Sequence, residues 1–183
     1  MVEANVSRQI RVTLYSPEED RIERVLPGLR DAHRFTLNTL PPFLRFYTRI
    51  KDHEIFDYKK EAKSLRATVR HRLVQDLPNA TEQMRHDLDL IFGIVADVAD
   101  ELAEAKANLD EAGLNLALNS SDKFQFSYEE TRREFETKMS EFRTHFRGAD
   151  EFGKHLYDRR CALDRRLEVY KREIERRMPT QRD

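Results

Sequence analysis

The feature that most constrains this fold is an uninterrupted apolar repeat in the middle of the chain. Its members are alternately four and three residues apart: Met84, Leu88, Ile91, Val95, Val98, Leu102, Ala105, Leu109, Ala112 and Leu116. A mean spacing of 3.5 residues places these side chains along one stripe of an α-helix, the stripe through which coiled-coil helices pack. The repeat predicts a helix of about 38 residues, roughly 57 Å long. Asn79 and Glu82 form a capping-box-like start for it.

A second repeat of the same kind runs along the C-terminal third of the chain. Its members are Tyr128, Phe135, Met139, Phe142, Phe146, Ala149, Leu156, Leu163, Leu167, Tyr170 and Ile174. Gly153 and Arg160 occupy two skipped positions, but the register is the same on either side of them. We therefore expect one bent helix from Ser127 to Met178, about 78 Å long. The polar residues 119–122 predict the loop that precedes it.

The N-terminal part of the chain also has a helical pattern, interrupted by prolines. Ser16 can cap a helix in which Pro17 takes the first position, with Glu19 completing a capping box. Helical periodicity continues to Leu77, and Pro78 follows it. Pro27 is followed by Gly28, and Pro41 is followed by Pro42, so we expect kinks or breaks at both places.

These patterns predict an all-α protein made of three long kinked helices in an elongated, coiled-coil-like bundle. Charged residues make up 37% of the 183 residues, which is typical of long helices that bury a single stripe. We expect one helical domain over 17–178. Residues 1–16 form an N-terminal extension whose segment 9–15 alternates like a strand, and residues 179–183 form a disordered tail.

Catalytic and metal-binding patterns are weak in this sequence. The six histidines form no metal-binding motif, and the five glycines are too scattered for a phosphate-binding loop. Cys161 lies between Arg160 and Ala162 inside a predicted helix, where no oxyanion hole is expected. We therefore expect a protein that is not an enzyme and that holds neither a cofactor nor a metal.

Localisation can be predicted from what the sequence lacks. It has no apolar run of about 18 residues, as a membrane-spanning helix needs, and its first residues do not form a signal peptide. A single cysteine fits a reducing compartment. We expect a cytoplasmic protein, with peripheral association to a membrane as one of its options.

Charge is unevenly distributed along the chain, and one basic cluster stands out. Residues 79–122 carry 2 basic and 10 acidic side chains, a net charge of −8. Just before them lie Lys59, Lys60, Lys63, Arg66, Arg70 and Arg72. On a helix, Lys59, Lys63, Arg66 and Arg70 would share one stripe, which we call the basic stripe. It could attract the phosphates of lipid or nucleic acid, or it could neutralise the acidic segment.

The pattern of helices resembles that of the BAR domain superfamily. The resemblance covers residues 17–178 and depends on helix number, helix length and aromatic–acidic segments such as Tyr128-Glu129-Glu130, Phe135-Glu136 and Leu167-Glu168-Val169-Tyr170. It implies a crescent-shaped homodimer that binds anionic membranes. The lipid contacts that it implies are Lys59, Lys63, Arg66, Arg70, Arg165 and Arg172.

Three functions remain open. The first is a dimeric helical scaffold that associates with anionic membranes, because the seam residues Phe135, Phe142, Phe146, Leu163 and Leu167 need cover from a second copy. The second is a protein–protein assembly module that pairs with itself or with another helical protein. Nucleic-acid binding is the least favoured, because no aromatic residues interleave the basic stripe. Basic residues on one face would favour lipid, whereas charges that cancel between helices would favour assembly.

Overall fold

The computed structural model describes residues 17–178, and its regular structure there is helical throughout. It contains four helices: α2 (Pro17–Lys51), α3 (Tyr58–Gln75), α4 (Glu82–Leu118) and α5 (Asp122–Arg177). Helix accounts for 90% of this part of the chain, which contains no strand. The all-α prediction is confirmed, but the predicted count of three helices is wrong. Ser16, the strand-like segment 9–15 and the tail 179–183 lie outside the described residues.

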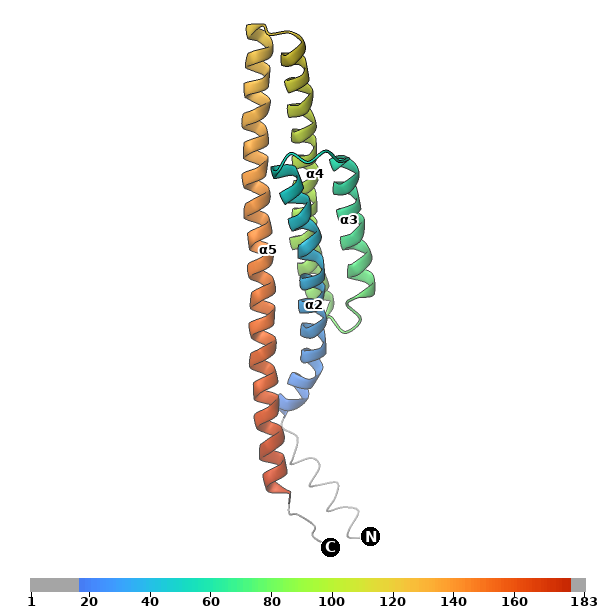
Figure 1. The fold of residues 1–183 in the computed structure, drawn as a ribbon. Helices are drawn as coiled ribbons and strands as arrows, with labels where there is room; N and C mark the ends of the chain where they lie inside the picture. The colour runs from blue at the N-terminus through green and yellow to red at the C-terminus, as the bar shows by residue number, and fades with distance from the viewer. Residues whose placement is uncertain (1–16, 179–183) are drawn as a thin grey trace.

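The helices form an elongated bundle that has four helices only over part of its length. Helix α5 runs along the whole molecule, while α2, α3 and α4 pack against one another beside its middle (Figure 1). Helices α4 and α5 continue past the end of α2 and the start of α3 as a two-helix hairpin. At the opposite end, the first turns of α2 lie beside the last part of α5 (Figure 1).

Of the kinks or breaks expected at the prolines, no break occurs, because helix α2 continues through all three of them. Proline cannot donate to the carbonyl four residues earlier, and in a helix interior it costs about 3 kcal/mol. The carbonyls left without a helical donor belong to exposed residues, where water can satisfy them: Glu23, Leu37 and Asn38. The buried face of the helix keeps its packing on either side of each proline, with Leu29 and Phe43 almost fully covered.

The missed boundary lies at residues 52–57, where the first long helical segment divides into α2 and α3. His53 has a φ of 55°, the left-handed conformation that most often holds glycine at a helix end. The His53 amide donates to Ile50 and the Glu54 amide donates to Arg49, the two bonds of a Schellman motif. A further ion pair joins Arg49 to Glu54 at 2.9 Å. Asp57 then caps α3 by accepting from the Lys60 amide.

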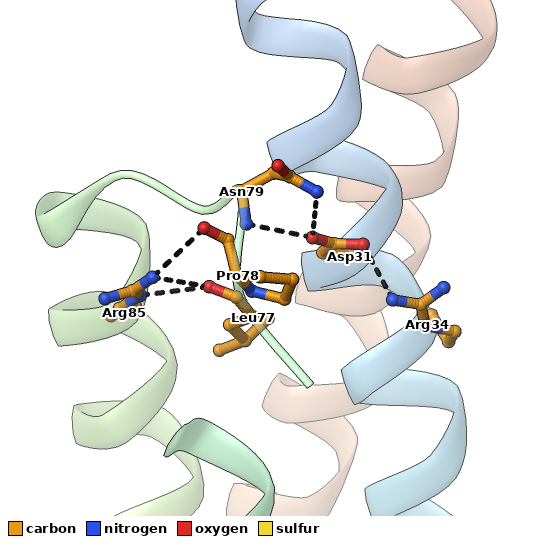
Figure 2. A network of polar contacts seen from close by, with 6 residues as sticks. All are labelled: Asp31, Arg34, Leu77, Pro78, Asn79 and Arg85. Atoms are coloured by element: carbon orange, nitrogen blue, oxygen red, sulfur yellow. Dashed lines mark hydrogen bonds and ion pairs between the residues drawn. The ribbon is translucent and has the colours of Figure 1, made fainter. Parts of the chain in front are cut away.

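The loop between α3 and α4 is held on α2 by a buried carboxylate (Figure 2). Asp31 accepts two hydrogen bonds from Asn79, from its backbone amide and its side-chain amide, each 3.1 Å long. It also pairs with Arg34 at 2.7 Å. On the other side of the loop, Arg85 donates to the carbonyl of Leu77. The loop is therefore connected both to α2 and to the helix that follows it.

This arrangement corrects the predicted start of α4. Asn79 does not cap the helix, because its side chain binds Asp31; Thr81 is the N-cap and accepts from the Met84 amide. The same close approach explains Gly28. A Cβ at that position would lie 2.6 Å from the carbonyl oxygen of Asn79, so only glycine fits. Gly28 is thus a packing residue within α2.

Helix α5 is continuous, as predicted, and it starts at Asp122, five residues before the predicted Ser127. It passes α2 closely at Gly153, where an added Cβ would lie 2.4 Å from Cγ2 of Thr36. Aromatic side chains fill the core nearby, because Phe142 packs against both Phe43 and Tyr47. These contacts fix α5 against α2 in the middle of the molecule.

Candidate interaction surfaces

The basic stripe lies on the flank of α3 that faces α4, and the structure divides it. Arg66 forms ion pairs with Asp97 at 2.6 Å and with Asp100 at 2.7 Å, so it neutralises part of the acidic helix. Lys59, Lys63 and Arg70 are exposed and have no ion-pair partner among residues 17–178. Charge cancellation between helices is therefore real at Arg66, while three cations of the stripe remain open to solvent.

The two other predicted lipid contacts lie elsewhere. Arg165 and Arg172 are on the C-terminal part of α5, and α5 is separated from α3 by the other helices (Figure 1). Each makes a local contact on its own helix: Arg165 donates to the carbonyl of Cys161, and Arg172 pairs with Glu168 at 3.2 Å. The six predicted contacts therefore do not gather on one face.

The predicted dimer seam on α5 is partly covered within a single chain. Phe135 and Phe142 are buried. The cover comes from α2 and the loop after it: His53 of that loop lies against Phe135, and three aromatic residues of α2 surround Phe142. Phe146, Leu163 and Leu167 are half-buried. Phe135 and Phe142 therefore do not need a second copy to cover them, contrary to the reasoning that predicted a dimer.

A different apolar surface is left open at the protruding α4–α5 hairpin. No residue from Gly113 to Glu134 is buried. At its tip Leu114 is 61% exposed, Leu118 78% and Phe126 66%. Residues 112–127 hold two charged side chains, Asp122 and Lys123, in a chain that is 37% charged. Most helices in proteins depend on tertiary packing for their stability. The helical turns of the hairpin tip lack the packing that stabilises the rest of the bundle.

A cavity of about 650 Å³ lies at the base of this hairpin, where the α2–α3 loop crosses α4. Its lining residues come from the loop, the start of α3 and one face of α4: His53, Glu54, Ile55, Phe56, Asp57, Tyr58, Lys59, Lys106, Ala107 and Asp110. Ile55 is fully exposed at its rim. The cavity is thus an open notch with an apolar edge.

The floor of the notch contains a buried lysine. Lys106 is 5% exposed; its ammonium group pairs with Asp110 at 2.5 Å and lies over the ring of Tyr58. The Tyr58 hydroxyl donates to the same carboxylate at 3.0 Å. Burial, together with this hydrogen bond and the negative charge of Asp110, raises the pKa of Tyr58 to about 12. Every polar group of this triad has a partner, so the triad fixes the shape of the notch and leaves no group poised for chemistry.

Sequence reasoning missed both the notch and the open hairpin. Lys106 carries a usable signal, because it is one of two basic residues in the acidic segment and precedes Asp110 by one helical turn. The hairpin tip carries a signal as well, since its charge density is far below that of the chain. Neither signal shows where α2 ends and α3 begins relative to α4. The open surface exists because α4 and α5 extend beyond those two points.

Other chemistry is sparse within residues 17–178. They contain no group of three or more side chains able to hold a metal ion. Cys161 is half-buried and unpaired, and its interaction with Tyr157 raises the pKa of that phenol. Between α2 and α5, burial and the nearby Arg160 lower the pKa of His33. No helix in this part of the chain has the length and apolar character needed to cross a membrane.

Comparisons of the chain with protein-family models, with curated proteins and with solved structures find no match. The surfaces described above are therefore the basis for assigning a function to this protein.

Proposed function

We propose that this protein is a non-enzymatic, self-associating helical scaffold, an assembly module whose contact element is the protruding α4–α5 hairpin. The observation that carries this proposal is the run of residues from Gly113 to Glu134. No residue of this run is buried, although it belongs to the two helices of the hairpin and the turn between them. Helices of this kind are marginal in water unless another element covers them.

The distribution of charge supports assembly over lipid binding. Arg66 belongs to an ion-paired contact between α3 and α4, and the other predicted lipid contacts lie on two separate helices. A membrane-binding face must present its cations on one side, so that each comes within about 8–10 Å of the lipid surface, the distance over which salt screens the attraction. The arrangement matches the pattern that charge cancellation between helices predicts.

The test is the mass of the full chain in solution. Sedimentation equilibrium from low to tens of micromolar should show a mass above the 21.8 kDa of one chain, rising with concentration toward twice that value. A mass that stays at one chain over this range would contradict self-association.

A second candidate function, association with anionic membranes, is favoured by one observation: Lys59, Lys63 and Arg70 are exposed and unpaired within the described part of the chain. Each cation near an anionic surface contributes about 1 kcal/mol. If lipid binding occurs, the triple variant Lys59→Glu, Lys63→Glu, Arg70→Glu should lose co-sedimentation with anionic vesicles and keep its helicity. Failure of the unaltered protein to bind such vesicles at low salt would exclude this function.

A further inference from the structure

We infer that the hairpin pairs with the hairpin of a second copy in antiparallel fashion, so that the tip of each α4 seats in the notch at the base of the other. This inference depends on the proposed self-association and deepens it by assigning the contact surface and its register. The surface is one face of α4, made of Ala107, Leu114 and Leu118, together with the notch.

The face in question continues an interface that the single chain already makes. Positions 96, 103, 107, 114 and 118 of α4 follow one another in steps of seven and four, which keeps them on one side of a helix. Ala96 and Ala103 are buried in the stretch of α4 against which α3 packs. Beyond Tyr58, where α3 begins, the same face is uncovered and its next large members are exposed. It lacks the helix that covers it lower down.

A second copy of α4 fits the direction that this face requires. Helix α3 runs antiparallel to α4, and a two-fold axis across the hairpin would lay the partner's α4 along the same path in the same direction as α3 (Figure 1). From Asp110 at the notch to Leu118 at the tip, α4 rises about 12 Å. With the axis at Leu114, Leu118 of one copy lies opposite Asp110 in the partner's notch, because both positions are four residues from the axis, and Leu114 meets its own counterpart.

The chemistry of the tip and the notch is complementary. The end of α4 is apolar and lacks charge from Ala112 to Asn119, so it can enter the notch without stranding an ion there. The notch receives it with the fully exposed Ile55 and the rings of Phe56 and Tyr58, while Lys106 is already neutralised by Asp110.

The first experiment measures the dimer dissociation constant by sedimentation equilibrium for the full chain and for Leu114→Glu. We expect the substitution to weaken the dimer at least roughly 100-fold, because it places two carboxylates at the axis of a buried contact. Leu90→Glu is the matched control: Leu90 lies on the same helix and is 56% exposed, but outside the proposed surface. It should leave the dissociation constant unchanged, and circular dichroism should show the same helicity for both variants.

The second experiment reads the register by disulfide cross-linking in a Cys161→Ala background. Disulfides need Cα atoms about 4.4–6.8 Å apart. Leu114→Cys should therefore give a covalent dimer on oxidation, because position 114 faces itself across the axis. Leu118→Cys alone should not, because the two copies of position 118 lie eight residues, about 12 Å, apart along the helices. Leu90→Cys should stay uncross-linked.

Each remaining outcome overturns the inference in a recognisable way. A dimer that is insensitive to Leu114→Glu, or that cross-links Leu118→Cys with itself, refutes the surface or the register but leaves self-association standing. A monomer at all concentrations refutes the proposed function as well. Binding to vesicles of neutral phosphatidylcholine by a monomer, lost both in Leu114→Glu and in Phe126→Glu, would make the tip a lipid-inserting element instead. Phe126 distinguishes lipid insertion from dimerisation, because it is not part of the proposed dimer surface. It lies two residues from the half-buried Tyr128 and therefore on another side of α5.

Discussion

Two glycines of α5 separate the effect of packing from the effect of helix propensity. A Cβ at Gly153 would lie 2.4 Å from Cγ2 of Thr36, whereas a Cβ at Gly148 would meet no atom within 4 Å. Gly153→Ala should therefore lower the free energy of unfolding by about 1–3 kcal/mol through overpacking. Gly148→Ala should raise it by up to about 1 kcal/mol, because alanine favours the helix. Thermal or urea unfolding of both variants measures the contrast.

A rescue variant shows whether the contact with Thr36 causes the loss. Thr36→Ser removes Cγ2 but keeps the hydroxyl that donates to the carbonyl of Ala32. Combined with Gly153→Ala, it should recover most of the lost stability. Equal effects of alanine at positions 148 and 153 would show that α5 does not approach α2 as closely as described.

Asp31 should contribute more to stability than the residue it binds. Asp31→Ala removes the acceptor of two hydrogen bonds from Asn79 and the partner of Arg34, and should cost about 1–3 kcal/mol. Asn79→Ala removes one side-chain hydrogen bond and should cost about 1 kcal/mol. Chemical denaturation gives both values. A larger loss for Asn79→Ala would contradict the network in Figure 2.

Tyr58 makes stability depend on pH in the alkaline range. Its pKa is about 12 in the folded chain, against about 10 in an unfolded one, so the folded state holds the phenolic proton more tightly. The resulting stabilisation is fully present below pH 10 and is lost as pH rises toward 12. The stability difference between the unaltered protein and Tyr58→Phe should therefore shrink over that range. In a pH titration followed by tyrosinate absorbance, the Tyr58→Phe variant should lack one phenol that ionises near pH 12 in the unaltered protein.

At the scale of helices, the basic stripe should respond unequally to charge reversal. Arg66→Glu would set a carboxylate beside Asp97 and Asp100 and should cost on the order of 1–2 kcal/mol, discounted because the group is partly solvated. Lys63→Glu changes the charge by the same amount but breaks no ion pair, and should be nearly neutral. Urea midpoints compare them at low salt. Equal losses would mean that the α3–α4 contact is not made through Arg66.

The long helices could be predicted from sequence because their apolar repeat is the direct record of the face that they bury. The boundary between α2 and α3 could not, because the chain ends α2 with histidine in a conformation that usually calls for glycine. The prolines, by contrast, do not break α2. Their cost depends on whether the freed carbonyls face water, and that is decided by the packing of α2 and not by the local sequence.

At the scale of the whole molecule, a repeat shows which face of a helix is buried but not what buries it. The apolar repeat of α4 predicts that one face is buried along the whole stretch from Met84 to Leu116. Helices α2 and α3, however, lie beside only part of that length (Figure 1). The same ambiguity made Phe135 and Phe142 look like dimer contacts when α2 covers them. The open hairpin and its notch arise from relative helix lengths, which no single repeat contains.

Amide hydrogen exchange should show these unequal degrees of cover directly. The middle of α5 is buried at Phe142, Ala149 and Leu156, so its amides should exchange slowest. After Leu156 no residue of α5 is buried, and the hairpin from Gly113 to Glu134 has none either, so both ends should exchange fast in the monomer. At concentrations where the dimer forms, the hairpin should become protected while the C-terminal end of α5 stays fast. In Leu114→Glu the hairpin should stay fast at every concentration. Slow exchange throughout the hairpin in a sample shown to be monomeric would mean that these helices need no partner, and the structural argument for assembly would fail.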